Sequence, residues 1–192
     1  MKLVKAALLL LFLALPWALH AQMMLRFDDI KRFEVGGNFD YLHANAPPGH
    51  CGCFSMYGGS GTFLMNVTRK WSALADITVA HASNVNNSGQ NILIINYLFG
   101  PRFTYRNPSR YVPYGEVLLG GAKEDVNFQF TINRQSFGVL AGGGVRTRIK
   151  PRLGANIIQV DYVYTRIPNA VNNTQNNLRI STGITYHFGG GE

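Results

Sequence analysis

The residues best suited to nucleophilic chemistry are His81 and Ser83, within the stretch 81–84. A serine beside a histidine base can attack an ester, and the histidine needs a carboxylate to orient it. The chain has no Asp or Glu between Asp76 and Glu116. We therefore interpret His81 and Ser83 as an ordinary polar strand end, with a catalytic pair as the alternative.

Four side chains able to bind a soft metal ion lie close together in the sequence: His43, His50, Cys51 and Cys53. Imidazole and thiolate groups are the usual ligands of zinc and copper. The Cys-x-Cys spacing is tight for zinc, so we predict a small strained disulfide or two free thiols, with a metal site as the alternative. With two cysteines in all, the chain is not a disulfide-stapled scaffold, and we predict no cofactor.

The elements that must position these residues are strands, because apolar side chains alternate with polar or small ones from Arg32 onward. Eight segments show the alternation, at about 32–43, 58–68, 72–82, 92–106, 112–122, 136–148, 154–166 and 178–188. Their even number and their lengths are typical of strands that cross a membrane. The sequence predicts an all-β fold, an eight-stranded antiparallel up-and-down transmembrane β-barrel.

The connections between these segments alternate between short and long. The short ones centre on 69–71, 107–110 and 150–152, and the long ones, rich in Asn, Ser and Gly, are 44–57, 83–91, 123–135 and 167–176. Short turns on one rim and long loops on the other are typical of outer-membrane barrels. Most basic residues fall on the short-turn rim. Arg26, Lys31 and Arg32 come before the first strand, and those near the turns are Arg69, Lys70, Arg106, Arg110, Arg148, Lys150 and Arg152. We interpret them as a solvated periplasmic rim near anionic headgroups and predict no nucleic-acid partner, because aromatic interleaving is missing.

The first residues have the pattern of a secretory signal peptide: a basic start, an apolar run over 6–15 and a small-residue exit. We predict a signal peptide over 1–21 and a barrel domain over 22–192. Lys2 and Lys5 would leave with the signal, which lowers the formal charge of +8 to 8 − 2 = +6. No later segment is apolar for long enough to form a membrane helix.

The polar parity of the strands carries charges of both signs: Glu34, Asp40, Asp76, Arg102, Glu116, Arg146, Asp161 and Arg179. The other residues of this parity are mostly small, which suits the narrow lumen of an eight-stranded barrel better than a soluble surface. We predict that these charges form a structural salt-bridge network inside the barrel. The alternative is a soluble lipocalin-like ligand-binding barrel, in which the apolar parity would face inward. We interpret the run Gly142–Gly144 as strand packing or a bend, because no helix follows it.

Three stretches resemble the eight-stranded outer-membrane barrel families, namely the OmpA transmembrane domain, OmpX-like and opacity-type proteins: Phe99–Phe103, Tyr114–Gly121 and Tyr186–Phe188. The resemblance covers about residues 32–188. It implies an integral protein of the outer membrane that contacts membrane lipids and lipopolysaccharide. Phe188 resembles the terminal aromatic residue that the barrel-assembly machinery recognises.

The stretch 81–84 is similar to the His-x-Ser-Asn element of lipid A 3-O-deacylases, which are also eight-stranded barrels. That resemblance implies a lipid A acyl hydrolase using His81 and Ser83, but the acid that follows the serine in that family has no counterpart here. We expect instead a non-enzymatic scaffold whose four long polar loops serve surface structure or interaction. The sequence does not identify an extracellular partner.

Overall fold

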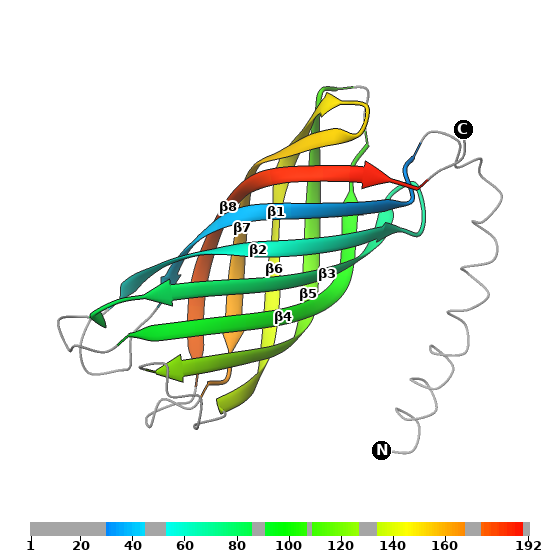
Figure 1. Cartoon of the computed structure of the whole chain (residues 1–192). Helices are drawn as coiled ribbons and strands as arrows, with labels where there is room; N and C mark the ends of the chain where they lie inside the picture. The colour runs from blue at the N-terminus through cyan, green and yellow to red at the C-terminus, as the bar shows by residue number, and fades with distance from the viewer. Residues whose placement is uncertain are drawn as a thin grey trace, which may run out of the picture.

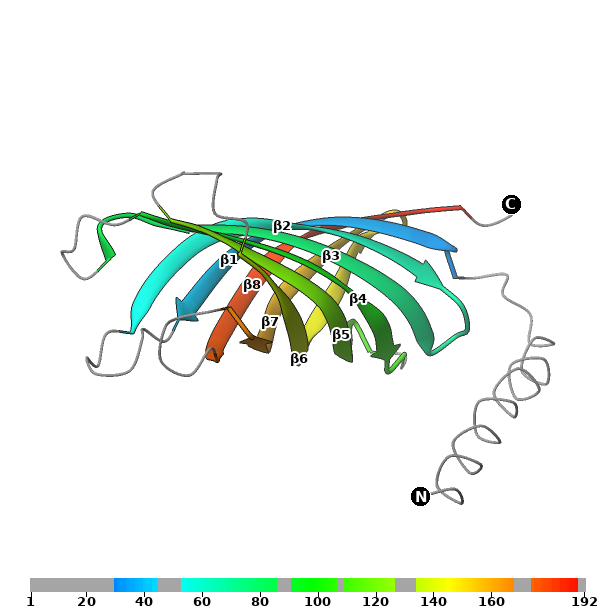
Figure 2. The same ribbon diagram turned by 90° about the horizontal axis from the view of Figure 1, so that it is seen from below.

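The computed structural model describes residues 30–44, 53–85, 91–106, 109–126, 134–167 and 174–189. These ranges hold eight strands: β1 (Phe33–Ala44), β2 (Phe54–Asn66), β3 (Trp71–Ala82), β4 (Ile92–Thr104), β5 (Tyr111–Val126), β6 (Arg134–Lys150), β7 (Leu153–Thr165) and β8 (Gln175–Phe188). Each strand pairs antiparallel with its sequence neighbours, and β8 pairs with β1 to close the barrel (Figure 1). Figure 2 shows the strands from a second direction, curving together around one axis. The predicted fold is confirmed, while the predicted signal peptide lies outside the described residues.

The described part of the chain contains no helix that is long and apolar enough to span a membrane.

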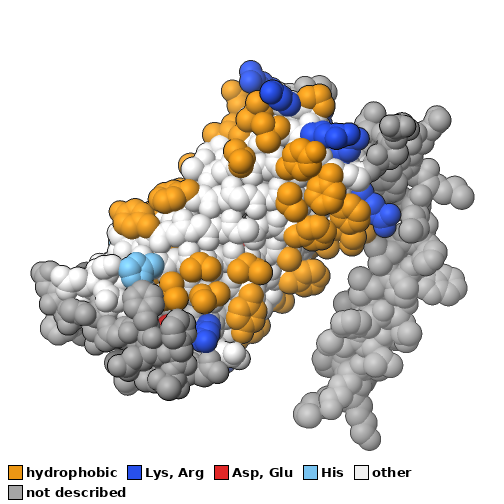
Figure 3. Space-filling model, in the orientation of Figure 1, with side chains coloured by type: hydrophobic (Ala, Val, Ile, Leu, Met, Phe, Trp, Pro, Cys, Tyr) orange, Lys and Arg blue, Asp and Glu red, His pale blue; other side chains and the backbone are white. Residues whose placement is uncertain are grey.

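The alternation along each strand separates an apolar outer wall from a polar interior. Phe99 is 64% exposed and Ile184 62%, whereas Asp40 and Asp76 are almost fully buried. Hydrophobic side chains spread over the barrel wall, and Lys and Arg gather at the end that carries the turns (Figure 3). A wall this apolar suits hydrocarbon rather than water. The arrangement is the reverse of the lipocalin-like alternative, in which the apolar parity would face inward.

Aromatic side chains gather at both ends of the wall. At the turn end, the Phe33 ring lies 5.7 Å from that of Phe188, and the Trp71 and Phe103 rings are 5.1 Å apart. At the loop end, the rings of Tyr41 and Tyr57 are 5.4 Å apart. Such paired belts are what the two interfaces of a membrane barrel require.

Several strands, notably β2, β5, β6 and β8, run further toward the loop end than the sequence indicated. β2 begins at Phe54 rather than near 58, because residues 54–57 pair in register with the end of β1. β5 continues to Val126, and β6 begins at Arg134. The connections at this end are therefore 45–53, 83–91, 127–133 and 166–174, shorter in three cases than predicted. The turns at the other end are 67–70, 105–110 and 151–152.

A bulge in β7 interrupts the simple alternation. The register with β8 shifts between Asn156 and Gln159. As a result Ile157 and Ile158 both face outward, while Asn156 and Gln159 both face the lumen. A bulge re-aims side chains in this way because one strand gains residues relative to its partner.

The interior also holds two apolar clusters that the alternation in the sequence does not predict. One takes a residue from each of β2–β7 and is formed by Leu64, Leu74, Leu98, Leu118, Leu140 and Val163. The other lies near the loop end of β1–β4 and is formed by Leu42, Ala44, Met56, Ala80, Ala82 and Ile94. The lumen is therefore filled by alternating apolar and charged groups.

Candidate functional site

The middle of the lumen is organised around Arg179 of β8, which is 2% exposed. Its Nε donates to Oδ2 of Asp161 over 2.9 Å. Its Nη1 donates to Oδ1 of Asp76 over 3.1 Å and to Oγ1 of Thr78 over 2.6 Å. One guanidinium thus joins β8 to β7 on one side and to β3 across the barrel. Charge-assisted hydrogen bonds in a desolvated site are strong, so the contacts of Arg179 contribute to holding β3, β7 and β8 together.

A second ion pair lies beside the first and is connected to it. Arg102 donates from Nε to Oε2 of Glu116 over 2.6 Å, and its guanidinium lies 4.3 Å from the centre of the Tyr114 ring. Gln159 bridges the two pairs, because its Nε2 donates to Oε1 of Glu116 over 2.9 Å and to Oδ2 of Asp161 over 2.8 Å. The two buried arginines therefore belong to one network.

The two remaining acids lie on β1 and have different partners. Glu34 forms an ion pair with Arg146, and its Oε2 also lies 3.0 Å from Nε2 of His187. Asp40 accepts a hydrogen bond from Ser181 through Oδ1, and no described residue forms an ion pair with it. All eight charged residues named from the sequence point into the barrel, and seven of them are joined to an opposite charge.

Several network members were not identified from the sequence. The Tyr114 hydroxyl oxygen lies 3.0 Å from Oδ1 of Asn156 and 2.7 Å from Oε1 of Gln159, so its single proton is shared between the two acceptors. Tyr114 and Gln159 lie at strand positions that the sequence predicts to face inward, so the alternation could have identified them as lumen residues. Asn156 joins them only because of the bulge.

Glycines on β6 make room for this network. A Cβ placed on Gly142 would lie 2.1 Å from Oδ1 of Asp161, and one on Gly144 would lie 2.7 Å from the hydroxyl oxygen of Tyr114. Only a residue without a side chain permits such an approach. The run Gly142–Gly144 therefore serves strand packing in a specific way. Gly142 leaves space for the Asp161 carboxylate, and Gly144 leaves space for the Tyr114 hydroxyl group.

The filled lumen has a clear physical consequence. An eight-stranded barrel encloses just enough space for side chains. Here that space holds the ion network and the apolar cluster of β2–β7, so the interior is a packed core. The arrangement brings opposite charges together and is suited to holding the wall closed.

The predicted alternative nucleophile and base lie on the outer side of the wall. His81 is half-buried on the outward parity of β3, and Ser83 is exposed beyond its end. The register places Leu93 opposite His81, and Asp125 opposite Leu93. His81, Leu93 and Asp125 therefore form one row across β3, β4 and β5. Asp125 lies two strands from His81, at about 10 Å by the usual strand spacing, with Leu93 between them. This row does not supply the orienting carboxylate that a catalytic pair needs.

The predicted metal-ligand set is only partly covered. His43 is exposed near the end of β1, and Cys53 is a free, exposed thiol next to β2. His50 and Cys51 lie outside the described residues. Among the described residues, no three His, Cys, Asp or Glu side chains are arranged to hold a metal ion.

Comparison with solved structures shows the fold class. The chain is similar to Neisserial surface protein A with a TM-score of 0.64 and 16% identity, over 81% of this chain and 97% of that one. It is similar to OprG of Pseudomonas aeruginosa with a TM-score of 0.55 and 11% identity, over 84% and 97% of the two chains. It is similar to Ail, the attachment invasion locus protein of Yersinia pestis, with a TM-score of 0.54 and 12% identity, over 82% and 99%. The chain has the fold of eight-stranded outer-membrane β-barrels.

No protein-family model matches the chain, and comparison with curated protein sequences gives no match.

Proposed function

We propose that this protein is an integral outer-membrane barrel without enzymatic activity, a closed scaffold that holds four polar connections at the cell surface. The observation that carries the proposal is the contrast between a wall of exposed apolar side chains and a lumen filled by paired charges. Such a wall requires hydrocarbon around it. Such a lumen leaves no wide path for solutes.

The connections at the loop end are suited to surface contact by their composition. The segments 45–53, 83–91, 127–133 and 166–174 contain one Lys or Arg, Arg166, and no Asp or Glu. Asn recurs in all four. Uncharged side chains such as Asn can both donate and accept hydrogen bonds. They can therefore bind water, sugars or protein surfaces whether or not the binding surface is charged. We infer that the barrel presents these segments outward, where they serve surface structure or interaction.

We also infer the partners of the wall. Its apolar side chains would contact outer-membrane lipids, including the acyl chains of lipopolysaccharide. Tyr186 and Phe188 at the end of β8 would be recognised by the assembly machinery during insertion, after export directed by the signal peptide.

The first test compares electrophoretic mobility of the protein from outer-membrane fractions with and without boiling in detergent. We expect a shift on boiling, because a closed barrel with a buried ion network resists detergent at room temperature. Planar bilayer recordings should show no large, stable conductance. Recovery of the protein as a soluble periplasmic species would contradict the proposal.

The enzyme alternative has its own test, the substitution Ser83→Ala. Lipid A extracted from cells that express the wild type or the variant should have the same acylation by mass spectrometry. Deacylated lipid A in the wild-type sample, absent with Ser83→Ala, would establish a hydrolase and overturn the non-enzymatic proposal.

A further inference from the structure

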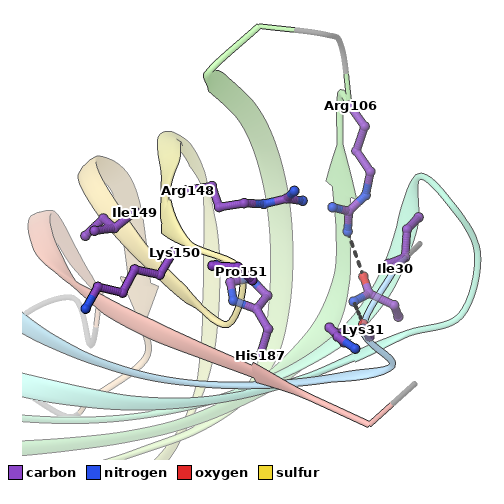
Figure 4. A pocket seen from close by; sticks show the side chains of 9 residues that line it. Ile30, Lys31, Arg106, Arg148, Ile149, Lys150, Pro151 and His187 are labelled. Atoms are coloured by element: carbon purple, nitrogen blue, oxygen red, sulfur yellow. Dashed lines mark hydrogen bonds between the residues drawn. The ribbon is translucent and has the colours of Figure 1, made fainter. Parts of the chain in front are cut away.

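A hollow of about 490 Å³ opens at the turn end of the barrel (Figure 4). Its lining residues come from the approach to β1, the ends of β2, β6 and β8, and two turns: Ile30, Lys31, Asn66, Arg106, Arg148, Ile149, Lys150, Pro151 and His187. Four of these nine residues are Lys or Arg, and none is Asp or Glu. The volume falls within the range of small-ligand sites.

Arg106 is held in a defined orientation by neutral acceptors. Its Nε donates to the backbone oxygen of Arg69 over 2.9 Å, and its Nη2 donates to Oδ1 of Asn66 over 3.1 Å. Asn66 is itself fixed, because Ser72 donates to its Oδ1 and its Nδ2 donates to the backbone oxygen of Lys31, over 2.7 and 2.8 Å. A guanidinium has five N–H donors, so the remaining ones are available to a ligand.

Arg148 extends from the opposite side of the hollow toward Arg106, as Figure 4 shows. Desolvation at the mouth, followed by the charges of Arg148 and Arg69, lowers the pKa of Arg106 below its ordinary value. The three guanidinium groups therefore repel one another. An anion placed between Arg106 and Arg148 would relieve that repulsion.

The protein supplies no such anion from the part of the chain that the structure describes. Glu34 contacts the lining residue His187, but its charge is already paired with Arg146. The described ion pairs do not include Arg106 or Arg148. A smaller hollow of about 60 Å³ shares both arginines and His187 and continues toward Arg146, so the cations converge on one space.

We propose that this hollow is a binding site for a phosphate-type oxyanion, held between the guanidinium groups of Arg106 and Arg148, with Lys31 adding positive charge. Planar guanidinium groups match the geometry of phosphate oxygens. The ligand is free phosphate or the headgroup of an anionic phospholipid, which present the same oxygens. Only the assignment of this mouth to the periplasmic side rests on the proposed function.

The first arm of the test measures binding of inorganic phosphate by calorimetry to the whole protein in maltoside micelles. Compared with the wild type, the double variant Arg106→Gln/Arg148→Gln should bind at least about tenfold more weakly, because each charge-assisted hydrogen bond contributes at least that factor. The matched control, Lys70→Gln/Arg110→Gln, removes two charges from the same rim outside the hollow. It should keep its Kd within about twofold of the wild type. The mobility of unboiled samples on gels shows that each variant is still a folded barrel.

The second arm identifies the source of the oxyanion. Native mass spectrometry after incubation with phosphatidylglycerol or phosphatidylcholine tests whether the anionic lipid is retained preferentially and lost in Arg106→Gln/Arg148→Gln. Retention supports a lipid headgroup, and phosphate binding without retention supports a soluble ligand. The proposal is overturned if the wild type binds neither probe, or if the control loses binding as strongly as the double variant. Neither result would affect the boiling shift or the conductance that test the proposed function.

Discussion

Arg179 in the middle of the lumen and Arg106 at the turn-side mouth belong to the same barrel, but their surroundings differ completely. Arg179 is 2% exposed and contacts two carboxylates, Asp76 and Asp161. Arg106 is exposed, donates hydrogen bonds to neutral oxygens of Arg69 and Asn66, and faces another arginine. The degree of burial explains the difference, because a fully desolvated charge must be paired by the fold, while a charge that keeps contact with water can stay unpaired and bind something else.

The largest expected effect comes from breaking the paired region. Arg179→Met would leave the Asp76 and Asp161 carboxylates buried without their cation, and we expect a loss of about 3–5 kcal/mol in unfolding free energy. Chemical unfolding of the protein in lipid vesicles measures it. The control Arg110→Met, on the solvated rim, should change stability by less than about 0.5 kcal/mol.

A compensated variant sharpens the same comparison. Adding Asp76→Asn and Asp161→Asn to Arg179→Met removes the unpaired charges and should recover much of the loss. If the triple variant is no more stable than Arg179→Met, the loss comes from packing rather than from charge.

The next largest effect concerns the wall that surrounds both regions. Ile77→Lys, near the middle of β3, places a charge where there is neither water nor a partner, and we expect a loss of about 2–4 kcal/mol in a bilayer. Ile77 is 57% exposed and Ile149, at the turn end, is 50% exposed, so Ile149→Lys is a matched control. It should cost no more than about 1 kcal/mol. Equal costs for the two variants would argue against hydrocarbon around the middle of the wall.

The smallest effect tests the space that the ion network needs. Gly142→Ala would bring a Cβ to 2.1 Å from Oδ1 of Asp161 and 2.5 Å from the backbone oxygen of Val160, so we expect a loss of about 1–3 kcal/mol. A Cβ on Gly61 would meet no atom within 4 Å, and Gly61→Ala should be neutral or slightly stabilising. Thermal unfolding of the two variants side by side measures the difference. A Gly142→Ala barrel as stable as the wild type would show that the Asp161 side chain and the backbone of β7 both have room to move.

The sequence predicted the eight strands and their two faces because the alternation of period two is a local property of the chain. Phe99 and Arg102 lie in one strand, and their parity alone places one outside and the other inside. Strand ends were predicted less well, since the early start of β2 at Phe54 depends on pairing with β1. The apolar cluster of β2–β7 was missed because its leucines lie on the parity that was predicted to be polar.

The pairings inside the lumen could not be predicted in the same way. Arg179 and Asp76 are 103 residues apart, and nothing local connects them. The bulge that turns both Asn156 and Gln159 inward is a mismatch between two strands and leaves little trace in one of them. The role of Gly142 likewise depends on a carboxylate that arrives from β7.

By itself the sequence determined which side chains face the lumen and which face outward, because alternate residues of a strand point to opposite sides. It also determined that basic residues gather near the short turns. The tertiary structure decided which charges neutralise one another and which remain free, because only closure of the barrel fixes the strand register. That register joins Arg179 to Asp76 and Asp161 and leaves Arg106 and Arg148 facing each other at an open mouth.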